Sequence, residues 1–168
     1  MRNLIIASLI VACAGAQAFT IDIVSVGTFV PGINYTASES VVFEAAPGNL
    51  TTLAVAGLVN NPGPNQFLTG SSLWTGGPDS LLVSFTSGPA SSGSAFTAAY
   101  SGTWVYTGGT GVYAGLTGGG SWSVVFDSGN NNYSNHSFSG ELNAVPEPAS
   151  LALIGMAGFG YLSRRRRK

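Results

Sequence analysis

The sequence is poor in charge and almost free of cysteine. Six of its 168 residues are Lys or Arg, seven are Asp or Glu and one is Cys. A nucleic-acid-binding protein needs a basic surface, so that class is excluded. A single cysteine excludes a disulfide framework and any multi-cysteine zinc or iron–sulfur site. The 45% hydrophobic content argues against a charged disordered chain, and the length fits about one domain.

Basic residues are absent from the whole interior of the sequence. Apart from Arg2, all of them form one cluster at the C-terminal end: Arg164, Arg165, Arg166, Arg167 and Lys168. The seven acidic residues lie between these two ends, so a chain trimmed at both ends would carry a side-chain charge of about −7. Such a body repels nucleic acid and anionic lipid. We therefore expect the two basic ends to have separate roles.

The N-terminal segment has the three parts of a secretory signal. Arg2 is followed by an apolar run over residues 4–14 and then by Ala16-Gln17-Ala18. A short positive region, an apolar region of about ten residues and an A-x-A site are typical of a signal peptide. We expect a signal helix over residues 1–18 and cleavage by signal peptidase between Ala18 and Phe19.

Cys13 leaves one alternative for this end. The residues that precede it loosely resemble a lipobox, in which the cysteine is acylated and becomes the new N-terminus. Cleavage after Ala18 would instead leave a mature chain without any cysteine, which excludes thiol chemistry from its function.

The C-terminal segment combines a proline motif, an apolar stretch and the basic cluster. Pro146-Glu147-Pro148 precedes residues 149–162, which contain no charge. A helix of that length spans about 21 Å, short against a hydrocarbon core of about 30 Å. The basic cluster would stay on the cytoplasmic side. We therefore expect a short hydrophobic helix that is only transiently held in the inner membrane.

This order of elements resembles the PEP-CTERM sorting signal of Gram-negative bacteria. The resemblance covers residues 145–168 and implies recognition by exosortase, with cleavage near Pro146-Glu147-Pro148. It also implies an exopolysaccharide-producing host whose sorted proteins reach the cell surface or the biofilm matrix. The expected division is a signal peptide over residues 1–18, a body over residues 19–144 and the sorting segment over residues 145–168.

The body has the pattern of an all-β domain. Short stretches with alternating apolar and polar residues are separated by clusters rich in Gly, Pro and Asn, which is typical of a barrel or a sandwich. We expect a single antiparallel β-barrel, with a β-sandwich as the alternative. The expected strands are residues 20–29, 40–44, 51–58, 80–86, 95–106, 120–127 and 133–142.

Alternation also indicates which side chains form the core. One face of the fifth expected strand carries Phe96, Ala98, Tyr100, Gly102, Trp104 and Tyr106. Two other strands repeat the pattern, with the apolar positions Leu81, Val83, Phe85, Trp122, Val124 and Phe126. The 16 aromatic residues of the body, each burying about 150 to 250 Å², could supply most of a core without a disulfide.

One glycine-rich stretch resembles a known barrel. Residues 104–122 are similar to the G-T-G-x-[FY]-x-G-x-x-G segment of the allene oxide cyclase and dirigent superfamily. The resemblance implies that a strand ends at the glycine-rich turn, that a tight loop carries Tyr113, and that the next strand begins after the last glycine. It does not carry over any catalytic residue.

No catalytic constellation is evident in the body. His136 is the only histidine and stands beside an asparagine-rich loop, so we expect a solvated imidazole. Glu39 and Glu44 differ by an odd number, which places them on opposite faces if they share a strand. No G-x-S-x-G elbow is present. We expect no enzyme activity, no cofactor and no metal site.

Two hypotheses remain for the body. The first is a structural or adhesive protein of the cell envelope or extracellular matrix that associates with exopolysaccharide or with neighbouring copies. In it, Trp74, within the turn-rich residues 71–79, would be exposed and would stack on sugar rings. The second is a small barrel enzyme or hydrophobic-ligand binder at the cell surface, which needs a closed cavity with convergent polar groups. A barrel filled by Phe96, Trp104, Trp122 and Phe126 would exclude it.

Overall fold

The computed structural model describes residues 18–60, 65–93 and 97–145. These belong to one compact unit, Ala18–Val145. Residues 1–17 and 146–168 lie outside the described residues, and with them lie the expected signal helix, the Pro-Glu-Pro motif, the short hydrophobic helix and the basic cluster. The expected signal-peptidase site falls at the start of the first strand, between Ala18 and Phe19.

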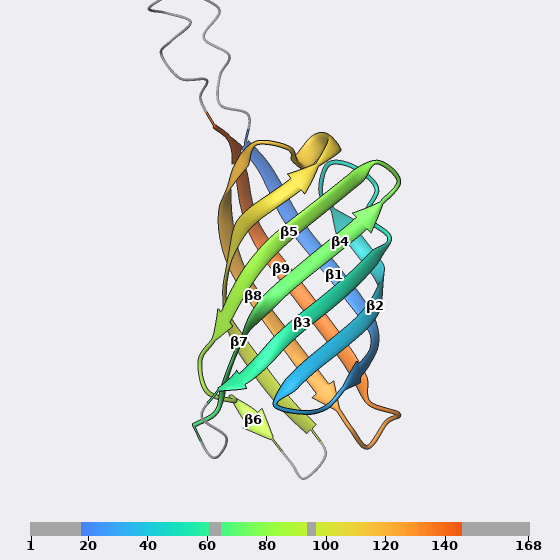
Figure 1. Ribbon diagram of the computed structural model, residues 1–168, viewed down its shortest axis with the longest axis vertical. Helices are drawn as coiled ribbons and strands as arrows, with labels where there is room; N and C mark the ends of the chain where they lie inside the picture. Colours follow the sequence, from blue (N-terminus) through green and yellow to red (C-terminus); the bar gives the residue numbers. More distant parts are fainter. Residues whose placement is uncertain (1–17, 61–64, 94–96, 146–168) are drawn as a thin grey trace, which may run out of the picture. The chain divides into compact units, whose positions relative to one another are not determined.

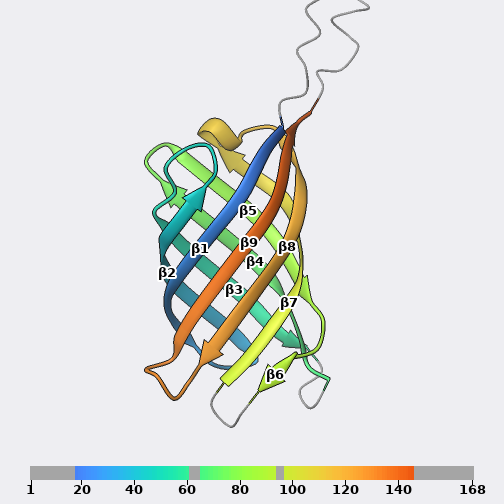
Figure 2. The ribbon, with the colours of Figure 1, turned by 180° about the vertical axis from the view of Figure 1, so that it is seen from behind.

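The body is a closed antiparallel barrel of eight strands (Figures 1 and 2). Neighbouring strands follow each other along the chain, and pairing between β1 and β9 and between β5 and β7 closes the ring. Closure confirms the barrel expectation over the sandwich. The strands are β1 (Ala18–Val30), β2 (Asn34–Ala45), β3 (Thr52–Asn60), β4 (Phe67–Gly76), β5 (Asp79–Ser87), β7 (Thr97–Thr110), β8 (Leu116–Asp127) and β9 (Tyr133–Ala144); the two-residue β6 (Ser92–Gly93) pairs only with β7.

The strands are strongly tilted, as closure requires. Moving from Val30 to its direct partner on the next strand, and so on round the barrel, leads back to β1 at Thr20. The offset along β1 is therefore ten residues. An eight-stranded barrel of this kind has an interior that side chains can just fill. Ala18 pairs with Asn143, so β1 begins and β9 ends at the same end of the barrel, which we call the closed end (Figure 1).

The core lies on the inner face, where the sequence places it. Tyr100, Trp104, Trp122, Val124 and Phe126 are all buried, as are Leu81, Val83 and Phe85. Phe96 lies outside the described residues. Inward glycines make room for the largest rings. A Cβ at Gly140 would lie 2.8 Å from the Trp104 ring and 2.7 Å from the Cα of Gly120 on the next strand.

One strand was not expected from the sequence. β4 runs through residues that are rich in Ser, Thr and Gly and that we interpreted as turns. Its inward positions are Leu68, Ser72 and Trp74, together with the small residues Gly70 and Gly76. A Cβ at Gly76 would lie 1.6 Å from the backbone oxygen of Asn49, so a small residue is required there. Tight packing in the barrel, not turn formation, explains this composition.

Candidate functional site

The two ends of the barrel are built differently. At the closed end the 3₁₀ turn η1 (Gly111–Tyr113) follows β7 and lays the fully buried Tyr113 side chain over the interior. The Tyr113 hydroxyl donates to the backbone oxygen of Pro47, and Tyr106 donates to the backbone oxygen of Tyr113 at 2.6 Å. Gly111 adopts φ of 60°, which favours glycine. This end is therefore plugged.

The glycine-rich segment differs in one respect from the resemblance stated above. The loop does carry Tyr113, but β8 already begins at Leu116. Gly118, Gly119 and Gly120 therefore lie within the strand instead of before it. Neighbouring backbone approaches these positions so closely that a side chain would not fit. A Cβ at Gly120, for example, would lie 2.0 Å from the backbone oxygen of Ser139.

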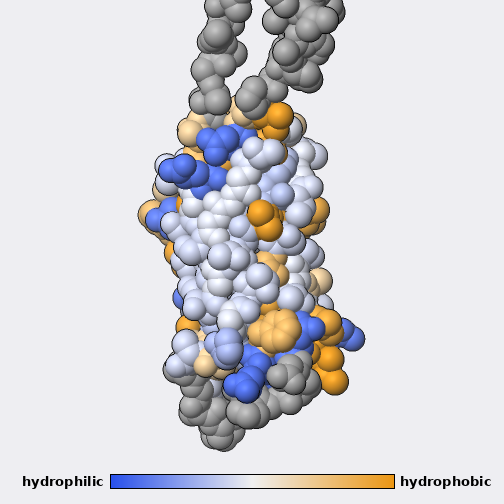
Figure 3. All heavy atoms as spheres, turned by 90° about the vertical axis from the view of Figure 1, so that its left-hand side faces the viewer, coloured by the Kyte–Doolittle hydropathy of each residue, from blue (hydrophilic) through white to orange (hydrophobic). Residues whose placement is uncertain are grey.

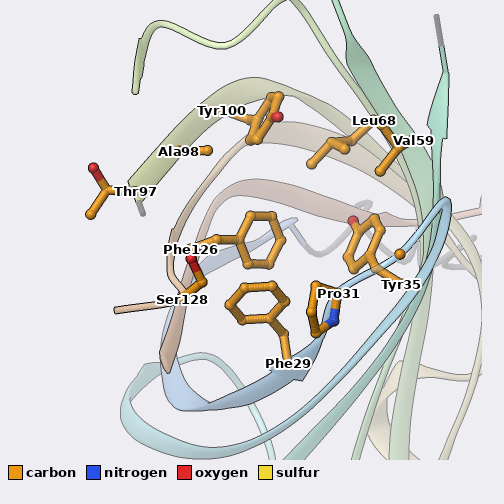
Figure 4. Close-up of a pocket in the computed structure, with 11 residues that line it drawn as sticks. Phe29, Pro31, Tyr35, Val59, Leu68, Thr97, Ala98, Tyr100, Phe126 and Ser128 are labelled. Atoms are coloured by element: carbon orange, nitrogen blue, oxygen red, sulfur yellow. The ribbon is translucent and has the colours of Figure 1, made fainter. Parts of the chain in front are cut away.

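The opposite end of the barrel is hollow, and we call it the mouth. A cavity of about 230 Å³ lies there (Figure 4). Aromatic rings and aliphatic side chains from β1, β2, β4, β7 and β8 dominate its wall. The main lining residues are Phe29, Tyr35, Leu68, Ala98, Tyr100 and Phe126. Phe29 and Phe126 contact each other with ring centroids 4.6 Å apart.

Tyr35 and Tyr100 each bring a hydroxyl to the mouth, which Thr97 and Ser128 also line. Tyr35 projects from β2 and Tyr100 from β7, four strands apart in the eight-stranded ring and therefore on opposite walls. The Tyr35 hydroxyl is buried and makes no hydrogen bond to a described residue. Gln66 Nε2 donates to the Tyr100 oxygen, which leaves the Tyr100 proton free to donate. Burial raises the pKa of both phenols, so each stays protonated and acts as a donor.

A buried polar cluster lies inside the barrel beyond the mouth. Glu39 Oε1 accepts from His136 Nδ1 at 2.6 Å and from Ser134 Oγ at 2.5 Å, and its Oε2 accepts from Ser25 Oγ at 2.7 Å. All four side chains are at most 4% exposed. Burial raises the pKa of Glu39, but the hydrogen bonds and the His136 charge outweigh it, so the pKa lies below its usual range. The carboxylate is thus the acceptor, and His136 Nδ1 carries the proton.

The expectation of a solvated His136 was wrong. The imidazole is fully buried and stacks against Trp122 at 6.1 Å and Phe138 at 6.3 Å between centroids. An acid that orients the Nδ1 proton of a histidine supplies, with that histidine, two of the three members of a hydrolytic triad. However, His136 Nε2 has no hydrogen-bond partner among the described residues, so no nucleophile is bonded to it there. Among the described residues the cluster therefore lacks the hydrogen-bonded nucleophile of a triad.

The expectation for Glu39 and Glu44 was also wrong. Both lie on β2, but pairing with β1 shifts by one residue at Val42, because Ser25 pairs with Val41 and Val24 with Phe43. This bulge resets the alternation along β2, so Glu39 and Glu44 do not lie on opposite faces of the strand. Glu44 is consequently half-buried, and both of its carboxylate oxygens accept from the Leu50 backbone N–H, at 3.1 and 3.2 Å.

Trp74 cannot serve as an exposed glycan contact. It is only 1% exposed and packs edge-on against Phe138 inside the barrel, with centroids 4.5 Å apart. The sequence interpretation failed because it placed the residue in a turn, whereas β4 directs it inward. The signal that could have revealed this is the alternation of Leu68, Ser72 and Trp74.

The outer face offers a different surface, which we call the hydroxyl face. Six hydroxyl residues stand in register across three strands. Ser101 of β7, Ser123 of β8 and Ser137 of β9 form one row, and the parallel row is Thr103, Ser121 and Ser139. They line a shallow groove of about 490 Å³. Figure 3 views the side of the barrel that carries β7 and β8, where the middle is pale and strongly hydrophilic atoms gather toward the ends.

Within the described part of the chain, no group of three or more His, Cys, Asp or Glu side chains could hold a metal ion. The same residues include no helix that is long and apolar enough to cross a membrane. Asp127 fixes the turn that follows β8, because its Oδ1 accepts from the Gly129 backbone N–H at 3.0 Å.

Comparison with known proteins identifies the C-terminal segment. Residues 144–168 match the family model of the PEP-CTERM protein-sorting motif. No curated protein and no solved structure matches the chain. The chain therefore carries a PEP-CTERM sorting signal, which marks it as an exported protein processed by exosortase. The likeness of residues 104–122 to the allene oxide cyclase and dirigent barrels remains a resemblance of that stretch alone.

Proposed function

We propose that the body is a structural or adhesive module of the cell surface or extracellular matrix, and that it associates with neutral exopolysaccharide through the hydroxyl face. Export and processing follow from the sorting signal. The observation that supports the adhesive role is the register of the six hydroxyl side chains across β7, β8 and β9. The proposal gives the body a binding role and assigns it no catalysis.

The chemistry of this face suits a neutral glycan. Each Ser or Thr hydroxyl both donates and accepts, as sugar hydroxyls do. Neighbouring strands of a sheet lie about 4.8 Å apart and every second residue along a strand about 6.7 Å apart, so several side chains of the face can bind one glycan chain together. No charged side chain belongs to the face, and the body holds no Lys or Arg. An anionic polysaccharide would meet only repulsion from the acidic residues of the body.

The test is a binding measurement with the host's own exopolysaccharide, separated into neutral and anionic fractions. We expect the protein to bind the neutral fraction. A triple variant, Ser121→Ala, Ser123→Ala and Ser139→Ala, should weaken binding by at least about tenfold, since each lost hydrogen bond contributes about 0.5 to 1.5 kcal/mol. The matched control, Ser38→Ala and Ser40→Ala, changes outward serines of β2 and should bind as the wild type does. Preference for the anionic fraction would contradict the proposal.

The alternative of an enzyme or ligand binder inside the barrel finds less support. Trp104, Trp122 and Phe126 are buried in the interior, and these rings were expected to exclude a closed cavity. What is left of that alternative is the cavity at the mouth.

A further inference from the structure

The mouth has the shape and lining of a small-molecule site. Its cavity of about 230 Å³ exceeds the roughly 150 Å³ of an engineered apolar cavity that binds benzene. The wall is mainly carbon, because Phe29, Leu68, Ala98 and Phe126 all contribute to it (Figure 4). A single ring with a short substituent therefore fits the available volume.

The rim around this cavity is apolar as well. Val30 is 65% exposed, Ile33 is 63% exposed and Leu58 is 39% exposed. These residues lie where β1 ends, where β2 begins and toward the end of β3, which is the mouth end of all three strands. By strand alternation Val30 and Leu58 point outward next to the lining residues Phe29 and Val59, so they add exposed apolar surface beside the mouth.

The polar groups of the mouth select one kind of ligand atom. The Tyr35 hydroxyl lacks a partner among the described residues, and an unpaired buried donor is costly. Tyr100 on the opposite wall also has a proton to donate, because Gln66 occupies its oxygen. In Figure 4 the Tyr35 hydroxyl lies on the side of its ring that faces Tyr100 and Leu68. Tyr35 and Tyr100 line the same cavity from opposite walls, so a carbonyl oxygen held between the two hydroxyls would accept from both.

Charge excludes acids from this position. The body contains no Lys or Arg, so a buried carboxylate would lack a countercharge. The ionised Glu39 lies close enough to act on Tyr35, and it would repel an anion further. A fatty acid or an aromatic acid is therefore a poor ligand, and a neutral molecule is favoured.

We propose that the mouth binds a small neutral aromatic molecule whose carbonyl oxygen accepts hydrogen bonds from Tyr35 and Tyr100. This site is independent of the hydroxyl face, which lies on the outer surface of β7, β8 and β9. Failure of one proposal therefore leaves the other standing.

Three probes of similar size separate the contributions: acetophenone, ethylbenzene and benzoate. Calorimetric titration would measure the binding of each probe to the processed protein purified from its host. We expect acetophenone to bind about tenfold more tightly than ethylbenzene, which lacks the acceptor, and benzoate to bind more weakly than either. Equal binding of acetophenone and ethylbenzene, tighter binding of benzoate, or no binding of acetophenone would each overturn the proposal.

Variants locate the site. Tyr35→Phe and Tyr100→Phe should each weaken acetophenone binding about three- to tenfold and leave ethylbenzene unchanged. Tyr106→Phe is the matched control, because that hydroxyl bonds Tyr113 at the closed end. Ala98→Leu should block both ligands by filling the cavity, whereas Ala56→Leu, on the outer face of β3, should not. If Ala98→Leu binds acetophenone as the wild type does, the ligand sits elsewhere and the proposal is wrong.

Discussion

The two ends of the barrel are made by the same strands, yet among the described residues one end is plugged and the other holds a cavity. At the closed end Tyr113 and Leu142 are fully buried and Trp74 is 1% exposed. At the mouth Phe29 and Phe126 keep 9% and 8% of their surface exposed, and valine and isoleucine side chains reach solvent. Alternation along a strand puts side chains inside, but a loop that folds back over the end, as η1 does, decides whether that end is sealed.

A polar cluster also lies inside the barrel. Glu39 gathers His136, Ser134 and Ser25 around one carboxylate, with aromatic rings packed beside it. Such a cluster is tolerated because every oxygen of the carboxylate is hydrogen-bonded. It also links β1, β2 and β9 through side chains, because Ser25, Glu39 and His136 lie on these three strands.

The largest expected effect comes from removing the centre of that cluster. Glu39→Ala should lower the free energy of unfolding by about 3 to 5 kcal/mol, because it leaves His136 buried without its partner. Urea unfolding measures this change. The control Glu141→Ala removes an exposed carboxylate from β9 and should stay within about 0.5 kcal/mol. A Glu39→Ala protein as stable as the control would show that the cluster does not stabilise the barrel.

A matched pair of leucines compares the ends directly. Leu142→Ala at the closed end should cost about 3 to 5 kcal/mol of unfolding free energy, near the upper part of the range for such changes. Leu68→Ala at the mouth should cost about 1 kcal/mol less, because Leu68 lines the cavity and already lacks neighbours on one side. Equal costs, measured by denaturant unfolding, would mean that the mouth is as closely packed as the plugged end.

Serines inside and outside the barrel should differ in the same way. Ser25→Ala removes a hydrogen bond to the buried carboxylate and should cost about 1.5 to 3 kcal/mol. Ser123→Ala on the hydroxyl face should change stability by less than about 0.5 kcal/mol. The measurement is thermal unfolding of both variants; a larger loss for Ser123→Ala would contradict the assignment of that residue to binding.

The smallest effect is the dependence of stability on pH. Because the pKa of Glu39 is lowered in the folded protein, its contribution is complete above its usual value of 4.5. The contribution is lost as pH falls through the lowered pKa, with a slope of at most about 1.4 kcal/mol per pH unit for one group. Unfolding free energies measured between pH 2 and pH 7 should show this loss in the wild type. Glu39→Gln should have a flatter profile, and an identical profile would exclude Glu39 as the cause.

Much of the fold could be predicted from local patterns. The alternation of Leu81, Val83 and Phe85, and of Trp122, Val124 and Phe126, correctly gave strands and their buried faces. β4 was not predicted because its inward positions include Gly70, Ser72 and Gly76, which are residue types typical of turns. Their small size is required by close backbone contacts between strands that only the closed barrel creates.

The sites were less accessible to sequence reasoning. Glu39 is in phase with the buried Tyr35 and Ala37, so its burial could have been inferred from alternation. Its pairing with His136 could not, because β9 becomes a neighbour of β1 only when the ends of the meander meet. Tyr35 and Tyr100 likewise come to lie on opposite walls only because the barrel closes. The sorting signal, in contrast, is contained in one continuous segment and was recognised from its own residues.

The most direct test of the exported, processed role is the intact mass of the protein recovered from its host, after separation of membrane, cell-surface and matrix fractions. We predict a surface or matrix species that begins at Phe19 and ends between Pro146 and Ala149. A membrane-bound species that still ends in Lys168 would contradict this, because the C-terminal segment would then be a lasting anchor. A species that begins at an acylated Cys13 would contradict the expected signal-peptidase site.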